Sequence, residues 1–305
     1  MLPIIDLHAT DMTALYSLLL FIEKQCKTLK EIPCVTFDQQ LYVKAYEIVE
    51  AKKMNAFVRL GGFHQLMSFL GSIGTLMEGS GLRKALESVY TPVTVGHMFT
   101  GKAYSRAVRG HMLASSSLVS LLLDEFWNSL SDQDQTLLQT IYDAENPSQY
   151  EEYDIALALD SFIKNKVDTL SKESRTAALW INYIKYVSIV QLFIDAERRS
   201  DWISHVTASK LMLNLFAATG HNNYAKSCRL YIQSISELMK SYPEMHQQFM
   251  LGQHTLRRTT SGWSGLWTDL SIEQILMKSL KGRSGIIGRG ISENVMFVWT
   301  KSMHR

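Results

Sequence analysis

The chain has 305 residues, of which 46% are hydrophobic and 20% charged, a composition typical of a globular protein with a buried core and one that excludes a disordered chain. Its three cysteines are widely spaced and form no C-x-x-C pair, which excludes a disulfide framework and a zinc knuckle and indicates an intracellular protein, nuclear or cytoplasmic. The formal net charge of +2 gives no overall signature of nucleic-acid binding.

The charges are nevertheless unevenly distributed along the chain. Residues 44–110 hold nine Lys and Arg against four Asp and Glu, residues 111–200 hold seven against fourteen, and residues 252–305 hold eight against three. Two basic segments therefore flank an acidic middle. Solvated helix faces would explain this pattern, and so would two segments that face a polyanion.

The N-terminal segment predicts neither secretion nor membrane insertion. It lacks the basic region and the small-residue cleavage site of a signal peptide, and Asp6, His8 and Asp11 interrupt it early. Apolar runs elsewhere stay below the roughly 18 residues that a membrane span needs. We therefore expect no membrane partner.

The first third of the chain predicts two parallel strands. A helical period over 12–30, with Asp11 as its N-cap, is followed by a β-branched run at 34–37, a second helical period at 40–50 and another strand-like run at 56–61. An apolar helix follows Gly62. Two strands joined through a helix predict a parallel pair with a crossover connection.

The rest of the chain is mostly helical in pattern. Apart from a strand-like run at 91–95, residues 82–242 have helical periods without a fixed repeat, which predicts a helical bundle. After Pro243, the pattern predicts a strand or loop at 254–267, a helix at 268–281 with Asp269 in its first turn, and the basic glycine-rich loop 282–290.

Three short sequences suggest chemistry, and each has a simpler structural alternative. Asp38 ends the first strand, where a carboxylate can hold a divalent cation, but it can equally cap the helix that follows. His64 follows a glycine pair at a strand end, where a packed histidine is the commoner case. The Gly96–Lys102 sequence approaches a phosphate-binding loop, but it places Ala103 where that motif needs Ser or Thr.

Four segments together carry a resemblance to a known family. They are CVTFDQQLYVKAYEIV, FVRLGGFHQLMSFLGSIGTLMEGSG, GHNNYAKSCRLYIQSI and WSGLWTDLSIEQILMKSLKGRSGIIGRGISE. These segments resemble a widespread group of mobile-element-associated animal proteins, and their order is similar to the RNase H-like DDE transposase core in its hAT-like or Mutator-like form. The resemblance covers almost the whole chain.

The resemblance implies a fold and a set of site residues. It implies a predominantly helical α+β protein, with a partial RNase H-like core in 1–78, a helical insertion in 79–245 and a return helix with a basic segment in 246–305. Asp38 matches the second catalytic acid, His64 the motif histidine and Glu273 the final acid. In such enzymes the carboxylates hold two metal ions for phosphoryl displacement, which implies a Mg²⁺ or Mn²⁺ site at Asp38 and Glu273.

The sequence departs from the family pattern where the first acid belongs. The segment before Asp38 has no room for the strands that should precede it, and Gly61 replaces the cysteine or acid expected before His64. We therefore expect an inactive, transposase-derived remnant that retains a vestigial metal site and weak DNA binding, with a strand edge open to self-association. The residues expected to bind DNA are Arg257, Arg258, Lys278, Lys281, Arg283 and Arg289.

The alternative from another class is a helical protein-interaction module without any catalytic site, which would use the bundle at 101–240 as its working surface. A large exposed apolar patch on the bundle would favour this alternative.

Overall fold

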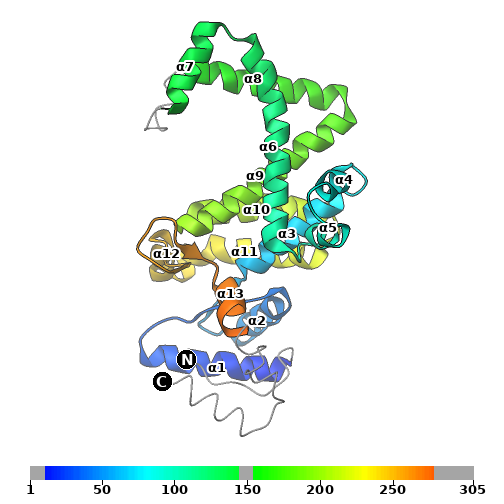
Figure 1. The fold of residues 1–305 in the computed structure, drawn as a ribbon. Coiled ribbons are helices and arrows are strands. Elements are labelled where there is room, and N and C mark those ends of the chain that lie inside the picture. Colours follow the sequence, from blue (N-terminus) through cyan, green and yellow to red (C-terminus); the bar gives the residue numbers. More distant parts are fainter. Residues whose placement is uncertain (1–10, 144–153, 278–305) are drawn as a thin grey trace. The chain divides into compact units, whose positions relative to one another are not determined.

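A computed structural model describes residues 11–143 and 154–277, and it is predominantly helical, as predicted (Figure 1). Its elements are α1 (Met12–Thr28), β1 (Cys34–Phe37), α2 (Gln39–Lys52), β2 (Phe57–Leu60), α3 (Gly62–Leu76), α4 (Leu82–Glu87), α5 (Pro92–Phe99), α6 (Tyr104–Ser129), α7 (Asp132–Asp143), α8 (Asp154–Glu173), α9 (Arg175–Arg199), α10 (Trp202–Ala218), α11 (Asn222–Ser241), α12 (Pro243–Met250), β3 (Leu256–Arg257), β4 (Gly265–Leu266), α13 (Thr268–Ser271) and the π-helix η2 (Ile272–Met277).

The parallel strand pair predicted from the sequence is confirmed. β1 pairs with β2 in parallel, with Cys34 opposite Phe57 and Phe37 opposite Leu60, and α2 makes the crossover connection. All four residues of β2 are buried, as expected for a strand covered on both faces. Because parallel strands end at the same edge, the residues after Phe37 and after Leu60 lie close together.

The described residues divide into two compact units. Unit 1 contains those of Met1–Ser72 and Gln191–Arg305, and unit 2 contains Ile73–Val190. This division differs from the predicted insertion at 79–245, because α11 packs against α2 and β2 and so joins the strands to the helices around it. The chain therefore passes from one unit to the other within α3 and again within α9.

The core of unit 1 surrounds the strand pair with large side chains. Tyr42 on α2 lies against Tyr231 on α11, with ring centroids 6.2 Å apart, and Phe69 on α3 lies against Phe216 on α10 at 5.7 Å. All four side chains are fully buried. Burial of aromatic surface on this scale accounts for the attachment of α10 and α11 to the strand pair.

The secondary structure of unit 2 consists of helices alone in its described residues. His111 Nδ1 lies 3.0 Å from the Tyr183 hydroxyl and links α6 to α9, while the rings of Phe126 and Phe162 link α6 to α8 with centroids 5.1 Å apart. Burial lowers the pKa of His111 to about 4, so this imidazole is neutral in the folded protein.

The strand predicted at 91–95 is wrong, and with it the phosphate-binding loop. α5 begins at Pro92, with Thr91 as its N-cap, and continues through Gly96 to Phe99. Proline at the first helical position and a threonine cap favour a helix, and they outweigh the β-branched valines. A helix through Gly96 leaves no open loop of backbone N–H groups to bind phosphate.

One described helix meets the size and composition of a membrane span. α9 is 25 residues long, and an 18-residue window within it is apolar enough to cross a bilayer. Only 28% of that window is buried in the structure, and the buried residues of α9 include Tyr183, Val187, Val190 and Phe193.

Candidate functional site

The first candidate site lies where β1 and β2 end. Asp38 directly follows β1, and its Oδ1 accepts a hydrogen bond of 3.0 Å from Leu41 N. Asp38 is therefore the N-cap of α2, which is the structural role left open by the sequence. A cap uses one carboxylate oxygen in this way and does not by itself exclude a bound ion.

Asp269 approaches the same edge from the far end of the chain. Its carboxylate accepts hydrogen bonds from Phe63 N at 3.2 Å and from His64 N at 3.1 Å, and its Oδ2 lies 3.0 Å from His64 Nδ1. The carboxylate thus caps the first turn of α3 and binds the histidine on that turn. A cap supplied from 205 residues away holds α13 against the end of β2.

Gly61 leaves room for this approach. A Cβ atom on Gly61 would lie 2.5 Å from Asp269 Oδ2 and 3.1 Å from the Phe37 carbonyl oxygen. A larger residue between Leu60 and α3 would therefore displace the Asp269 carboxylate. Gly61, which stands where the resemblance implies a cysteine or an acid, is thus the residue that leaves space for the Asp269 carboxylate.

The charges at this edge act on His64. Its pKa is raised, first by the hydrogen bond to Asp269 and further by the negative charges of Asp269, Asp38 and Glu273. The pKa of Tyr224 is also raised, by burial and then by the charges of Asp38 and Asp269. Asp38, His64 and Glu273, the three predicted site residues, thus interact electrostatically across the fold.

The metal site predicted at Asp38 and Glu273 stays a prediction. Glu273 lies half-buried on the π-helix η2, and Asp269, which the sequence placed only in a helix first turn, is the acid that binds His64. Within residues 11–143 and 154–277, the acids at this edge form no group of three ligand atoms within 4.8 Å of one another.

A second candidate site surrounds the β3–β4 hairpin. Arg257 donates from Nε to Ser200 Oγ at 3.0 Å, and Arg258 donates to Gln274 Oε1 at 3.2 Å. The guanidinium of Arg199 lies 5.6 Å from the ring centre of Trp263, whose side chain is 52% exposed. Arg198, which like Arg199 lies at the end of α9, donates from Nη1 to the Gly265 carbonyl oxygen of β4 at 3.4 Å. We call Arg198, Arg199, Arg257, Arg258 and Trp263 the arginine hairpin. The predicted DNA-binding residues Lys278, Lys281, Arg283 and Arg289 lie outside the described residues.

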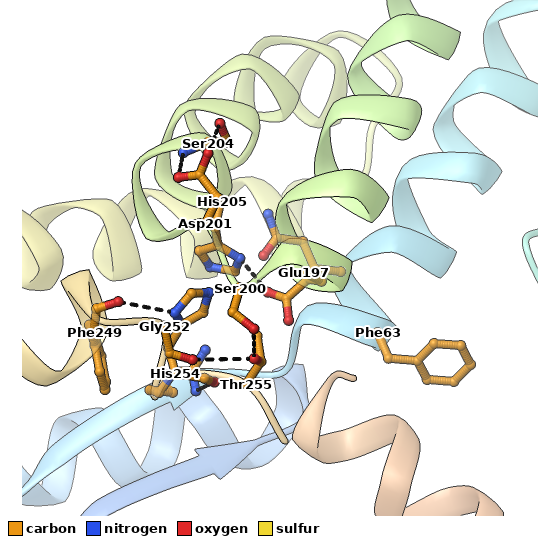
Figure 2. Close-up of polar contacts among 12 residues, drawn as sticks. Phe63, Glu197, Ser200, Asp201, Ser204, His205, Phe249, Gly252, His254 and Thr255 are labelled. Carbon is orange, nitrogen blue, oxygen red and sulfur yellow. Dashed lines mark hydrogen bonds and ion pairs between the residues drawn. The ribbon is translucent and has the colours of Figure 1, made fainter. Parts of the chain in front are cut away.

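A third group, which the sequence did not suggest, is buried in unit 1. Glu197, His205 and His254 are 1%, 1% and 2% exposed, and each places a ligand atom within 4.8 Å of those of the other two (Figure 2). His205 Nδ1 lies 2.6 Å from Glu197 Oε1. Burial and the nearby charges of His205 and Arg59 lower the pKa of His254 to about 2, so His254 is neutral.

The three residues of this group come from separate segments. Glu197 is near the end of α9, His205 lies in the first turns of α10, and His254 follows α12. Their spacing matches no local metal-binding motif, so only the folded chain brings them together.

Comparisons with known proteins identify a family without assigning an activity. No curated protein and no solved structure matches the chain. A family model described as a domain of unknown function (DUF8702) matches residues 1–305, the entire sequence. The chain therefore belongs to the DUF8702 family.

Proposed function

We propose that this protein is a transposase-derived remnant that binds DNA through the arginine hairpin and has lost strand-transfer activity. The proposal combines the partial RNase H-like order of the sequence with the geometry of two sites in unit 1. The observation that carries the DNA-binding part is the exposed Trp263 ring, which lies 5.6 Å from the guanidinium of Arg199 and follows the exposed Arg257 and Arg258 in the sequence.

The edge formed by the ends of β1 and β2 supports the transposase origin. Asp38 follows the first parallel strand, His64 follows the second, and a helical segment returns to the same edge with Asp269 and Glu273. This is the order of elements that the resemblance implies for an RNase H-like core interrupted by a helical insertion.

The same edge supports the loss of activity. Both oxygens of Asp269 accept hydrogen bonds, from Phe63 N and from His64, so the carboxylate that reaches this edge caps a helix and orients a histidine. Metal-dependent phosphoryl transfer requires carboxylates that converge on the ions. Here the Asp269 carboxylate stabilises the fold and does not serve as a metal ligand.

The arginine hairpin supports the binding of nucleic acid. Arginine guanidinium groups bind phosphates in two-pronged hydrogen bonds, and an exposed indole offers a face on which a base can stack. Hydrogen bonds to Ser200 and Gln274 hold the side chains of Arg257 and Arg258, and the guanidinium of Arg199 lies over the Trp263 ring. A site of this kind suits a single strand as well as a duplex.

A binding experiment with a tryptophan variant tests the stacking role. We expect Trp263→Ala to weaken the binding of a fluorescent single-stranded oligonucleotide by about 1 to 3 kcal/mol, measured by fluorescence anisotropy at low salt. The control is Trp127→Ala in unit 2, where a tryptophan of similar exposure, 40%, lies outside the arginine hairpin. Equal affinities for the two variants would contradict the proposed site.

Incubation with a supercoiled plasmid tests the loss of activity. In Mg²⁺ or Mn²⁺ the protein should leave the plasmid intact, because the acids at the strand edge form no compact ligand set among the described residues. Nicking that disappears in an Asp38→Asn variant would show an active metal site. A wild-type protein that binds neither oligonucleotide nor duplex would instead favour the helical interaction module.

A further inference from the structure

We propose that Glu197, His205 and His254 bind one transition-metal dication of the Zn²⁺ type, as a structural site that is separate from the strand edge and from the arginine hairpin. The ligand atoms lie within 4.8 Å of one another before any ion draws them together. Zinc bonds of about 2.0 to 2.2 Å place neighbouring tetrahedral ligands about 3.3 Å apart, so a modest contraction would bring these three side chains to bonding distance, and a water molecule would supply the fourth ligand.

The hydrogen bond made by His254 turns one ring nitrogen toward the group. Its Nδ1 lies 3.3 Å from the carbonyl oxygen of Phe249, which can only accept, so Nδ1 carries the hydrogen (Figure 2). In the neutral ring, Nε2 then presents a lone pair. A histidine whose second nitrogen donates to a backbone carbonyl is the usual arrangement of a metal ligand.

His205 is oriented in a similar way. Its Nε2 lies 3.3 Å from the hydroxyl of Tyr231, a fully buried side chain on α11, while its Nδ1 faces Glu197. Contacts outside the group therefore hold both imidazole rings. His205 directs Nδ1 toward the Glu197 carboxylate, and the hydrogen bond of His254 Nδ1 leaves Nε2 available to the group.

A metal-free alternative is a buried network of charges and hydrogen bonds. His205 Nδ1 and Glu197 Oε1 lie 2.6 Å apart, an ion-pair distance, although neither atom makes a hydrogen bond within the described residues. His254 Nε2 is also buried and has no hydrogen-bond partner in the described residues. A buried polar atom without a partner is costly, and a metal ion bound to its lone pair would remove that cost.

The kind of metal follows from the ligands and their surroundings. Two imidazoles and one carboxylate suit divalent transition metals such as Zn²⁺, Co²⁺ and Fe²⁺, whereas Mg²⁺ prefers oxygen ligands. Arg59 donates from Nη1 to the His254 carbonyl oxygen at 2.6 Å and adds a positive charge near the site. We therefore expect weaker binding than in a site that has a second carboxylate.

The bound ion would join three segments of unit 1. Only Ser200 and Asp201 separate α9 from α10, and Glu197 and His205 lie on either side of that corner. His254 lies two residues before β3, the first strand of the β3–β4 hairpin that carries Arg257. A metal at this point would fix the hairpin to the corner between α9 and α10, and its full burial favours a structural role over a catalytic one.

Cobalt titration of the full chain, after treatment with a chelator, tests the site. We expect one Co²⁺ per chain, with the strong visible absorption of four-coordinate Co²⁺, and displacement of that Co²⁺ by Zn²⁺ but not by Mg²⁺. A chain without these bands, or one that gives them up to Mg²⁺, would overturn the proposal.

Substitutions then assign the ligands. His254→Gln should weaken Co²⁺ binding at least tenfold, whereas His97→Gln, at an exposed histidine of α5, should leave it unchanged. If His254→Gln fails to fold, X-ray absorption of the zinc-loaded wild-type protein decides the matter. Two imidazoles at the zinc bear the proposal out, and a zinc without imidazole ligands, or equal Co²⁺ binding by the two variants, contradicts it.

Discussion

Asp269 joins two segments that the sequence alone does not connect. Its carboxylate binds two backbone N–H groups and the imidazole of His64 at the start of α3. The sequence identified Asp38 as a possible helix cap and His64 as a possible site residue, because both follow recognisable strands. It could not identify Asp269 as the partner of His64, because helix caps are recognised from neighbouring residues and this cap is supplied from a distant one.

A substitution of Asp269 should affect both stability and the titration of His64. Asp269→Asn removes the charge that favours protonated His64, so the pKa of His64 should fall toward its ordinary value of 6.5, measured by NMR titration. We expect a loss of about 1 to 2 kcal/mol in the free energy of unfolding.

The pH dependence of this loss follows from the direction of the shift. Because the folded protein raises the pKa of His64, the associated stability is present below pH 6.5 and disappears as the pH rises through the raised pKa. The control is Asp11→Asn, since Asp11 caps α1 through two N–H groups in the same way but locally. An unchanged His64 pKa in Asp269→Asn would contradict the pairing.

Gly61 allows a second test of the same contact. Gly61→Ala places a Cβ 2.5 Å from Asp269 Oδ2, so we expect it to destabilise the protein by about 1 to 3 kcal/mol in chemical unfolding. Gly96→Ala is the matched control, because nothing lies within 4 Å of a Cβ there and alanine favours the helix α5 by up to about 1 kcal/mol. Equal effects of the two substitutions would show that Gly61 is not in close contact.

Among the elements, those with a strong local signal were predicted well. Asp11 before an apolar helical period predicted α1, and two β-branched runs separated by a helix predicted the parallel pair. α5 was missed because its valines suggested a strand, although Thr91 and Pro92 form a typical helix start. The π-helix η2 also departs from the regular helix expected there, since a periodic pattern does not distinguish the two.

The contact between His111 on α6 and Tyr183 on α9 should make the stability of unit 2 depend on pH. The folded protein lowers the pKa of His111 from 6.5 to about 4, so protonation favours the unfolded state. The stability of unit 2 should therefore fall as the pH drops from about 6.5 to about 4, by about 2 to 3 kcal/mol in all. Hydrogen exchange of α6 and α9 measures this effect.

A substitution separates His111 from the other titrating groups. His111→Gln should remove most of the pH dependence of exchange in α6 over this range, whereas His97→Gln, at an exposed site, should preserve it. If both variants keep the wild-type dependence, His111 is not the group responsible.

At the scale of the whole molecule, the resemblance implied a core interrupted by a helical insertion at 79–245, whereas the compact units divide the chain at Ser72 and Val190. The sequence grouped all helices between 79 and 245, because their periods are alike. The fold assigns α10, α11 and α12 to the unit that contains the strands, since the buried faces of α10 and α11 meet α2, α3 and β2. Periodicity shows that a helix has a buried face but does not show which partner covers it.

The candidate sites also differ in whether a local sequence pattern could identify their residues. Asp38, His64 and Arg258 could be selected from the sequence because each stands at a strand end or in a basic run. The group of Glu197, His205 and His254 depends on contacts between α9, α10 and the segment after α12, so no local sequence pattern predicts it.

The salt dependence of DNA binding tests the central claim most directly. For the full chain on a duplex, the logarithm of the affinity should fall linearly with the logarithm of the salt concentration, and Arg257→Ala with Arg258→Ala should reduce that slope by about 1 per arginine. The variant Arg106→Ala with Arg109→Ala removes the same charge from exposed positions of α6 and should keep the wild-type slope. Identical slopes for the two double variants would contradict DNA binding through the arginine hairpin.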